Sequence, residues 1–244
     1  MKRLFTTTLF LFFSTIVTQA QVRPYIRAGV GVSRAIGGGV SQNGSIDQPL
    51  ELAGEEPVAG QLGGRLTRVV PNASAGLVVP VDRHFTIQTE IGLEQKGSVM
   101  TIGSLDDHLV RICACYPKAI GAVSSRLTYL MLPVLVGFRT GQATVAVGPY
   151  VGYKLDEQLS GSFQEVYSSN RTEIRSTRTN YQDVDVGFNA ELSYALTTSF
   201  GIDLRYSQSS RSIGRPYKRT YYTLYNYPVY NQTAQLSVRY NLGR

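Results

Sequence analysis

Hydrophobic and polar residues alternate along eight segments of this chain, which is the pattern of β-strands that have one apolar face. In the segment 143–155, for example, the odd-numbered positions are mostly aliphatic and the even-numbered ones are mostly small or polar. The pattern predicts an all-β chain. The eight predicted strands are 24–34, 69–80, 85–97, 127–139, 143–155, 184–196, 200–209 and 233–242.

The links between these strands alternate between short and long. Links 81–84, 140–142 and 197–199 hold only a few residues, whereas the other four, among them 35–68, 156–183 and 210–232, are far longer. Short turns at one end and long loops at the other are typical of outer-membrane β-barrels, and compact soluble domains rarely carry so many long loops. We therefore predict an eight-stranded antiparallel up-and-down transmembrane β-barrel with short periplasmic turns and long extracellular loops.

Alternation alone does not say which face of the strands meets lipid. In 184–196 the polar face carries Asp185, Gly187, Asn189, Glu191 and Ser193, so it is small as well as charged. Small residues suit the crowded interior of an eight-stranded barrel, whereas a water-facing surface has no reason to favour glycine. The aliphatic face is therefore expected to point outward and the polar face inward.

Strand parity then places both signs of charge inside the barrel. Because isolated buried charge is costly, we expect these groups to pair with one another and with trapped water. A proton or solute pathway along the lumen is the functional alternative. The candidate lumen network is Glu90, Glu94, Lys96, Asp185, Glu191, Asp203, Arg205 and Arg239, and Arg27, Gln88 and Lys154 share its parity.

Aromatic residues gather near both ends of the predicted strands. This placement predicts two aromatic girdles at the membrane interfaces, although aromatic residues favour strands in any case. Those near the short turns are Phe85, Phe138, Phe200 and Tyr240, and those nearer the long loops are Tyr129, Tyr153 and Tyr206.

The first twenty residues have the layout of an export signal. Lys2 and Arg3 precede the apolar run 4–17, and Thr18-Gln19-Ala20 supplies a small-residue ending. This resembles a secretory signal peptide, and the run is shorter than the ~20 residues of a membrane-spanning helix. We expect a signal peptide at 1–20, a single barrel domain at 21–244 and a location in the outer membrane after export.

Charge and cysteine content argue against a nucleic-acid partner and against a metal site. Without Lys2 and Arg3 the chain has 22 basic and 17 acidic residues, a formal charge of +5. Such a mild excess, scattered among acidic residues in an exported chain, gives no reason to expect a nucleic-acid partner. Cys113 and Cys115 could form a tight disulfide or remain separate thiols, and His108 nearby does not complete a metal-site pattern. No cofactor or metal is expected.

The candidate catalytic residues are few. The chain has two histidines, His84 and His108, and Ser104, Asp106 and Asp107 near His108 have no diagnostic spacing. Because a barrel enzyme needs a nucleophile and a base near its rim, we predict a non-enzymatic protein without catalytic residues.

The long loops are the expected sites of recognition. Segment 156–183 mixes arginine with glutamate and could extend two strands beyond the membrane. Segment 210–232 is basic and rich in tyrosine, which suits contact with phosphate or carboxylate groups. The alternative is a hairpin whose aromatic residues pack on neighbouring loops while its cations meet lipid headgroups. The candidate recognition loop is Arg211, Arg215, Tyr217, Lys218, Arg219, Tyr221 and Tyr222.

Four motifs add a resemblance over essentially the whole exported part of the chain. They are QTEIGLEQKG at 88–97, YLMLPVLVGF at 129–138, VGPYVGY at 147–153 and IDLRYS at 202–207. The chain resembles the PorT-like β-barrels of the Bacteroidota outer membrane, which are loosely grouped with porins and are similar in architecture to OmpA and OmpX barrels. It departs from that family at Leu93, where an aromatic residue is common, and in ending without a terminal aromatic. Pro133 and Pro149 lack backbone donors, so we expect bulges or local breaks there.

The resemblance implies a location and an architecture, and it allows a role in protein secretion. From it and from the strand pattern we expect a structural, binding or assembly component of the cell envelope. The expected partners are outer-membrane lipid and envelope or secretion-system proteins. A narrow porin-like pore is the alternative, followed by a lipid-modifying or proteolytic barrel enzyme.

Overall fold

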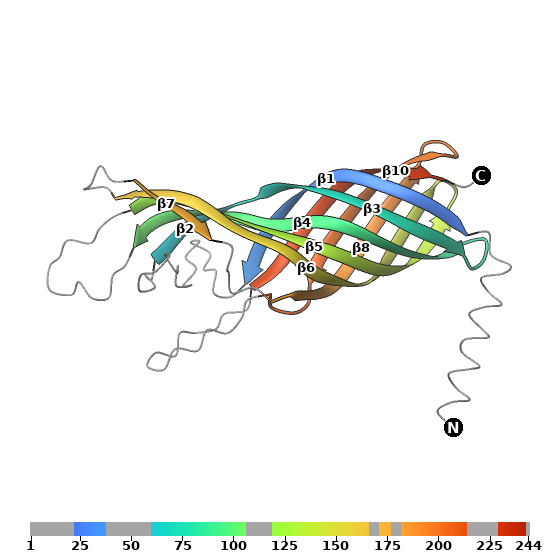
Figure 1. The fold of residues 1–244 in the computed structure, drawn as a ribbon. Helices are drawn as coiled ribbons and strands as arrows, with labels where there is room; N and C mark the ends of the chain where they lie inside the picture. The colour runs from blue at the N-terminus through green and yellow to red at the C-terminus, as the bar shows by residue number, and fades with distance from the viewer. Residues whose placement is uncertain are drawn as a thin grey trace, which may run out of the picture.

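The computed structural model describes residues 22–37, 60–105, 119–165, 171–176, 182–213 and 229–242, and its elements are β-strands (Figure 1). Two short strands, β2 (Gly60–Leu66) and β7 (Arg171–Ser176), lie beside the barrel strands at the long-loop end. The barrel strands are β1 (Arg23–Gly37), β3 (Arg68–Pro80), β4 (Phe85–Leu105), β5 (Ala119–Thr140), β6 (Ala143–Glu165), β8 (Val184–Ala195), β9 (Phe200–Ser209) and β10 (Val229–Asn241).

Eight strands close into one antiparallel barrel. The order around the wall is β1, β3, β4, β5, β6, β8, β9 and β10, so each strand pairs with its neighbours along the barrel sequence. Closure comes from β10 and β1, which pair from Tyr25 opposite Asn241 to Gly37 opposite Val229. The predicted eight-stranded up-and-down barrel is confirmed.

Several strands are longer at the long-loop end than the alternation predicts. β4 continues to Leu105, β5 begins at Ala119 and β6 continues to Glu165. β10 begins at Val229, so Tyr230 belongs to a strand and not to the preceding loop. The predicted ends were wrong here because residues beyond the membrane need no apolar face, and the alternation fades while backbone pairing continues.

The long strands form a sheet that projects beyond the barrel, at the left of Figure 1. β2 pairs with β4, and β7 pairs with β6 from Leu159 opposite Ser176 to Gln164 opposite Arg171. The projecting sheet therefore has the order β2, β4, β5, β6, β7. Of the two barrel strands that flank segment 156–183, β6 is extended to Glu165 as expected, whereas β8 begins at Val184 and β7 is a separate short strand.

The outer wall of the barrel is apolar and the inner wall is mostly polar. Along β6, Val145, Val147 and Val151 are each about half exposed, whereas Ala146 and Tyr150 between them are buried. Within the described residues no helix is long and apolar enough to cross a membrane.

The apolar band ends sharply toward the projecting sheet. A register shift opposite Thr128 and Tyr129 adds one residue to β6, so Leu155 and Asp156 are both exposed. Beyond this point the outer wall is polar, and Arg126 donates a hydrogen bond to Gln158. The bulge thus marks the edge of the lipid-facing surface.

The prolines interrupt strand pairing without shifting it. Pairing of β4 with β5 stops between Val134 and Met131, and pairing of β5 with β6 stops between Pro133 and Val136. The register is the same on both sides of each gap. The expected local breaks therefore occur at Pro133 and Pro149, and neither forms a bulge.

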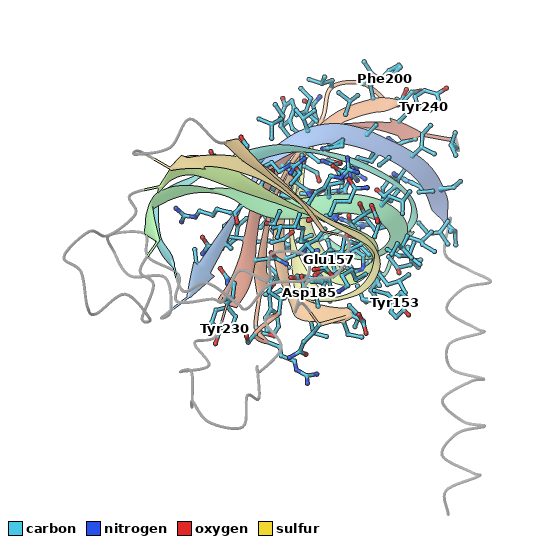
Figure 2. All side chains as sticks on the ribbon, turned by 60° about the vertical axis from the view of Figure 1, so that its left-hand side comes forward. Tyr153, Glu157, Asp185, Phe200, Tyr230 and Tyr240 are labelled. Atoms are coloured by element: carbon cyan, nitrogen blue, oxygen red, sulfur yellow. The ribbon has the colours of Figure 1, made fainter. Side chains whose placement is uncertain are left out.

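Aromatic pairs cover the outer wall near the short turns. Phe85 meets Phe138 edge to face, with ring centroids 5.5 Å apart. Phe200 and Tyr240 lie together with centroids 5.0 Å apart (Figure 2). These pairs match the predicted girdle at this end.

The predicted girdle at the other end was wrong at one position. Tyr153 and Tyr206 face outward, but Tyr129 is fully buried inside the barrel. Tyr129 shares the parity of Leu127 and Met131, which also point inward. Because this stretch is apolar on both faces, its sequence did not reveal which face the lumen takes.

Candidate functional site in the barrel lumen

A ring of ion pairs crosses the lumen at the level of Arg205. The Arg205 guanidinium donates hydrogen bonds to both Glu90 and Glu191, with Nε 2.8 Å from Glu191 Oε2. Arg27 repeats the arrangement, since Nη2 lies 2.6 Å from Glu90 Oε1 and Nη1 lies 2.7 Å from Glu191 Oε2. These four residues come from β1, β4, β8 and β9, so the ring ties together strands on different sides of the barrel.

Arg239 extends this ring toward the short turns. Its Nε and Nη2 bind the two carboxylate oxygens of Asp203 at 2.9 and 2.6 Å, a bidentate geometry that is strong for arginine. Nη2 also lies 3.1 Å from Glu191 Oε1. The Tyr25 hydroxyl donates to Glu90 at 2.9 Å, and the Arg239 guanidinium sits 4.9 Å from the Tyr25 ring centroid.

Charges balance within this central cluster, which is defined as Arg27, Glu90, Glu191, Asp203, Arg205 and Arg239. It has three arginines and three carboxylates, joined by ion pairs of 2.6–3.8 Å and two shorter ones. Buried charges are tolerated when they are paired and hydrogen-bonded, and this stoichiometry meets that condition. The cluster is therefore a neutral polar core whose ion pairs cross the lumen between strands on different sides of the barrel.

A second polar group surrounds Lys96, nearer the long loops. Its Nζ lies 3.0 Å from Asp185 Oδ2 and 3.8 Å from Glu94 Oε1. The same Nζ is 3.3 Å from the Tyr150 hydroxyl and 4.4 Å from the centroid of that ring, a cation–π contact. Asn231 donates to Asp185 at 3.3 Å. Lys96 is fully buried, so these contacts replace its water shell.

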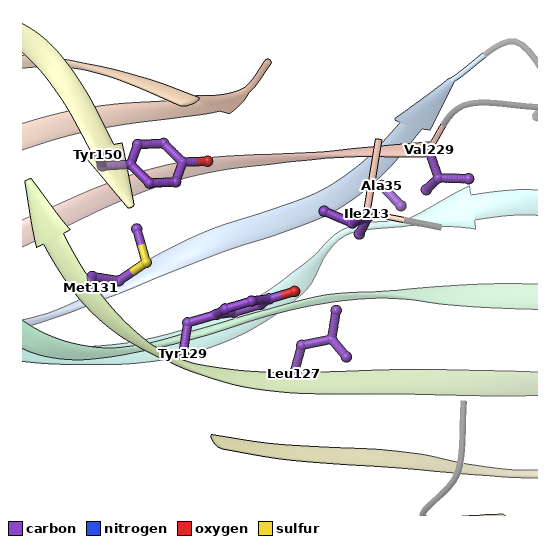
Figure 3. Packing of buried hydrophobic residues seen from close by; sticks show 7 residues of the cluster. All are labelled: Ala35, Leu127, Tyr129, Met131, Tyr150, Ile213 and Val229. Atoms are coloured by element: carbon purple, nitrogen blue, oxygen red, sulfur yellow. The ribbon is translucent and has the colours of Figure 1, made fainter. Parts of the chain in front are cut away.

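Buried apolar side chains also form a cluster inside the barrel (Figure 3). Two of its members, Tyr129 and Tyr150, have ring centroids 5.5 and 4.4 Å from Lys96 Nζ. Ile213 follows β9 and is fixed by its backbone, which donates to Val229 at 2.7 Å and accepts from Gln182 at 2.6 Å. The apolar layer consists of Ala35, Leu127, Tyr129, Met131, Tyr150, Ile213 and Val229. This layer was not predicted from the sequence, although a stretch that is apolar on both strand faces, such as 129–136, is its signal.

The candidate lumen residues all face inward, but the structure divides them into separate groups. Glu90, Glu191, Asp203, Arg205 and Arg239 belong to the central cluster, together with Arg27. Glu94, Lys96 and Asp185 form the second group. Lys154 stands apart, 2.5 Å from Glu157 and 3.4 Å from Asp183 at the long-loop end. In Figure 2, Asp185 and Glu157 lie within the barrel, whereas Tyr153 lies on its wall.

Of the residues in the candidate recognition loop, the structure describes Arg211, which is exposed. Its other members, Arg215, Tyr217, Lys218, Arg219, Tyr221 and Tyr222, lie outside the described residues. The predicted signal peptide at 1–20, His108, Cys113 and Cys115 lie outside them as well.

His84, the histidine that the structure describes, packs against residues at the short-turn end of the barrel. Its ring stacks on Phe138 at the short-turn end, with centroids 5.7 Å apart. Its Nδ1 lies 3.3 Å from the carbonyl oxygen of Arg139. In the described part of the chain, no group of three or more histidine, cysteine, aspartate or glutamate side chains could hold a metal ion.

Three solved structures are similar in fold to this chain. Ail, the attachment invasion locus protein of Yersinia pestis, has 11% identity and a TM-score of 0.39, covering 91% of this chain and 99% of its own. Neisserial surface protein A has 10% identity and a TM-score of 0.40, covering 90% and 97%. The outer membrane protease OmpT of Escherichia coli has 9% identity and a TM-score of 0.40, covering 91% and 94%.

The chain matches no curated protein. The model of a sequence family, described as the outer membrane protein beta-barrel domain, matches residues 19–213. That range takes in strands β1 to β9 and with them most of the barrel wall. The chain therefore belongs to the outer membrane protein beta-barrel domain family.

Proposed function

We propose that this protein is a non-enzymatic barrel that serves as a structural, binding or assembly component of the cell envelope. The observation that carries the proposal is the neutral central cluster, which occupies the lumen behind an apolar outer wall. A narrow barrel filled in this way is a membrane anchor and not a conduit. Its working surfaces then lie outside the membrane.

The projecting sheet is the surface that we assign to binding. It continues the three barrel strands β4, β5 and β6 beyond the barrel. Among the described residues, β2 pairs with β4 alone and β7 pairs with β6 alone, which leaves a strand edge on each side. Edge strands present backbone donors and acceptors that another protein can pair with. An envelope protein with an extended segment is the partner class that fits such an edge.

Sequence motifs support a narrower family and a narrower role. The motifs at 88–97 and 129–138 support membership of the PorT-like barrels of Bacteroidota, and that resemblance supports an association with protein secretion. The layout of residues 1–20 supports export by a signal peptide. The proposed partners are outer-membrane lipid and envelope or secretion-system proteins, with no nucleic acid.

Affinity isolation from native membranes in mild detergent tests the binding role. We expect an envelope protein to be recovered in near-stoichiometric amount, identified by mass analysis. Heat-dependent gel migration shows whether the barrel is folded. Deleting residues 159–176 removes β7 together with the part of β6 that pairs with it, and it should abolish recovery of the partner while the heat shift is retained.

A matched variant tests the alternative surface. Replacing Arg211, Arg215, Lys218 and Arg219 with glutamine alters the recognition loop and leaves the sheet intact. Loss of the partner in this variant, with retention in the deletion variant, would move the binding surface to the loop. A folded protein that is recovered alone would reject the assembly role.

Planar-bilayer recordings separate the anchor from a narrow pore. Because the buried side chains of the central cluster pair across the lumen, we expect no steady channels from the reconstituted protein. Steady, sizeable conductance would reject the anchor and favour the porin-like alternative.

A further inference from the structure

A blind cavity opens at the short-turn end of the lumen. Its volume is about 780 Å³, and its wall takes residues from every one of the eight barrel strands. Arg239 and Asp203 of the central cluster line the inner end of the cavity. The cluster therefore closes the cavity on the side away from the short turns. Since the short turns face the periplasm, a ligand would enter from that side.

Positive charge is in excess in this cavity. Its lining contains Arg23, Arg139, Arg239 and one carboxylate, Asp203. Both carboxylate oxygens of Asp203 already accept hydrogen bonds from the Arg239 guanidinium. Within the described residues neither Arg23 nor Arg139 forms an ion pair, and the Arg139 Nε donates to the carbonyl of Gly141 at 3.2 Å. Unlike the balanced central cluster, this site has two guanidinium groups available to an anion.

Buried polar atoms without partners lie on the same wall. Thr86 and Gln88 line the cavity and are 6% and 2% exposed, yet Thr86 Oγ1 and Gln88 Oε1 have no hydrogen-bond partner. Buried polar groups are almost always hydrogen-bonded, so these two need water or a ligand. A hydroxyl and an amide beside two arginines suit a molecule that has amide groups as well as a negative charge.

Gly137 lies directly against Thr86 and Gln88 of this wall. A Cβ placed there would lie 2.6 Å from Thr86 Oγ1 and 3.1 Å from Gln88 Nε2. Any larger residue at this position would therefore crowd both side chains.

We propose that the cavity is a binding site for the C-terminal carboxylate of a peptide segment that enters from the periplasm. Arg23 and Arg139 bind the carboxylate, because guanidinium matches a carboxylate with two parallel hydrogen bonds. Thr86 and Gln88 meet the peptide amides next to it. The cavity is much larger than a bare anion, and its amide and hydroxyl lining favours a peptide over inorganic phosphate. This site is independent of the projecting sheet and of the function proposed for it.

The test uses the full exported chain in lipid nanodiscs, with heat-dependent gel migration as the control for folding. Two pools of fluorescent random tetrapeptides are titrated and followed by anisotropy, one with free C-terminal carboxylates and one with C-terminal amides. We expect the acid pool to bind at least tenfold more tightly than the amide pool. Inorganic phosphate should compete weakly.

Variants locate the binding. The double variant Arg23→Gln/Arg139→Gln should weaken binding of the acid pool at least tenfold, and Gly137→Leu should abolish it by filling the wall. Arg126→Gln is the matched control, because this arginine lies at the opposite end of the barrel and binding should be unchanged.

Three results would overturn the proposal. Equal binding of the two pools would show that the carboxylate is not recognised. Unchanged affinity in the folded double variant would place binding elsewhere. Strong competition by phosphate, with no preference between the peptide pools, would reduce the site to an anion site only.

Discussion

Arg205 and Glu191 face each other across β9 and β8 and are joined by two hydrogen bonds, one from Nε at 2.8 Å and a shorter one from Nη2. Glu191 also accepts hydrogen bonds from Arg27 and Arg239. The single carboxylate of Glu191 thus accepts hydrogen bonds from three guanidinium groups. Its removal would leave three arginines facing two carboxylates in a buried space.

Glu191→Ala should therefore destabilise the barrel strongly. Breaking a buried ion pair by removing one partner costs about 3–5 kcal/mol, because the remaining charge is uncompensated. The free energy of unfolding can be measured by urea titration of protein refolded into lipid vesicles, with heat-dependent gel migration reporting the folded fraction.

Asp156→Ala is the matched control for this substitution. Asp156 is half exposed and lies 3.9 Å from Arg126 on the outer wall, where an ion pair contributes about 0–1 kcal/mol. If Glu191→Ala unfolded at the same urea concentration as Asp156→Ala, the central cluster would not be what holds the strands together.

The inward position of these charges could be predicted from the sequence, but their pairing could not. A period of two residues fixes which face each side chain takes once a closed barrel is assumed. Which charges meet across the lumen depends on strand tilt and stagger, and these are not local properties. Arg27 and Glu191 are 164 residues apart in the chain and still lie in direct contact.

The wrong predictions at the long-loop end also have a physical cause. The alternation of apolar and polar positions identifies the inward face of a strand where lipid contacts one apolar face. It does not do so where both faces are apolar, as around Tyr129. It fails again where neither face meets lipid, as in the projecting parts of β4, β5 and β6. Recognition residues such as Arg215 lie outside the described residues and stay predictions.

Two glycines on β6 should differ in their tolerance of a methyl group. At Gly148 a Cβ would meet the backbone carbonyl oxygen of Val134 at 2.0 Å, and a backbone cannot move aside cheaply. At Gly152 the nearest atom is Met131 Sδ at 2.7 Å, the end of a flexible side chain. We expect Gly148→Ala to lower the free energy of unfolding by about 1–3 kcal/mol and Gly152→Ala by less.

Urea titration of the protein in lipid vesicles measures the free energy of unfolding of both glycine variants. Equal losses would indicate that strand pairing at Gly148 yields as easily as the Met131 side chain. A smaller loss at Gly148 than at Gly152 would contradict the packing of β5 against β6.

The turn at 81–84 should respond to acid through Asp82. Its Oδ1 accepts backbone hydrogen bonds from Phe85 at 2.7 Å and His84 at 2.6 Å, and these bonds hold the pKa of the exposed carboxyl below its usual 3.8. A lowered pKa means that the stabilisation of the turn is complete above pH 3.8 and is lost as the pH falls through the lower value.

Carbon-13 chemical shifts of the aspartate carboxyl groups measure this directly in nanodiscs. We expect the Asp82 midpoint below 3.8, with the amide proton shifts of His84 and Phe85 following the same titration. Asp82→Asn should remove that step from both amide shifts. A midpoint at or above 3.8 would mean that the two backbone bonds do not persist in solution.

The contact between Phe200 and Tyr240 should stabilise the barrel beyond the area that each ring covers. The rings come from β9 and β10, face lipid near the periplasmic turns and lie 5.0 Å apart at a tilt of 52°. Tilted and edge-on aromatic pairs contribute about 0.5–1.5 kcal/mol beyond their burial. A double-mutant cycle with Phe200→Leu and Tyr240→Leu isolates this coupling, because leucine keeps an apolar surface toward the lipid. Coupling of that size would assign a stabilising role to direct ring contact, whereas additive losses would mean that each ring acts alone with the surrounding lipid.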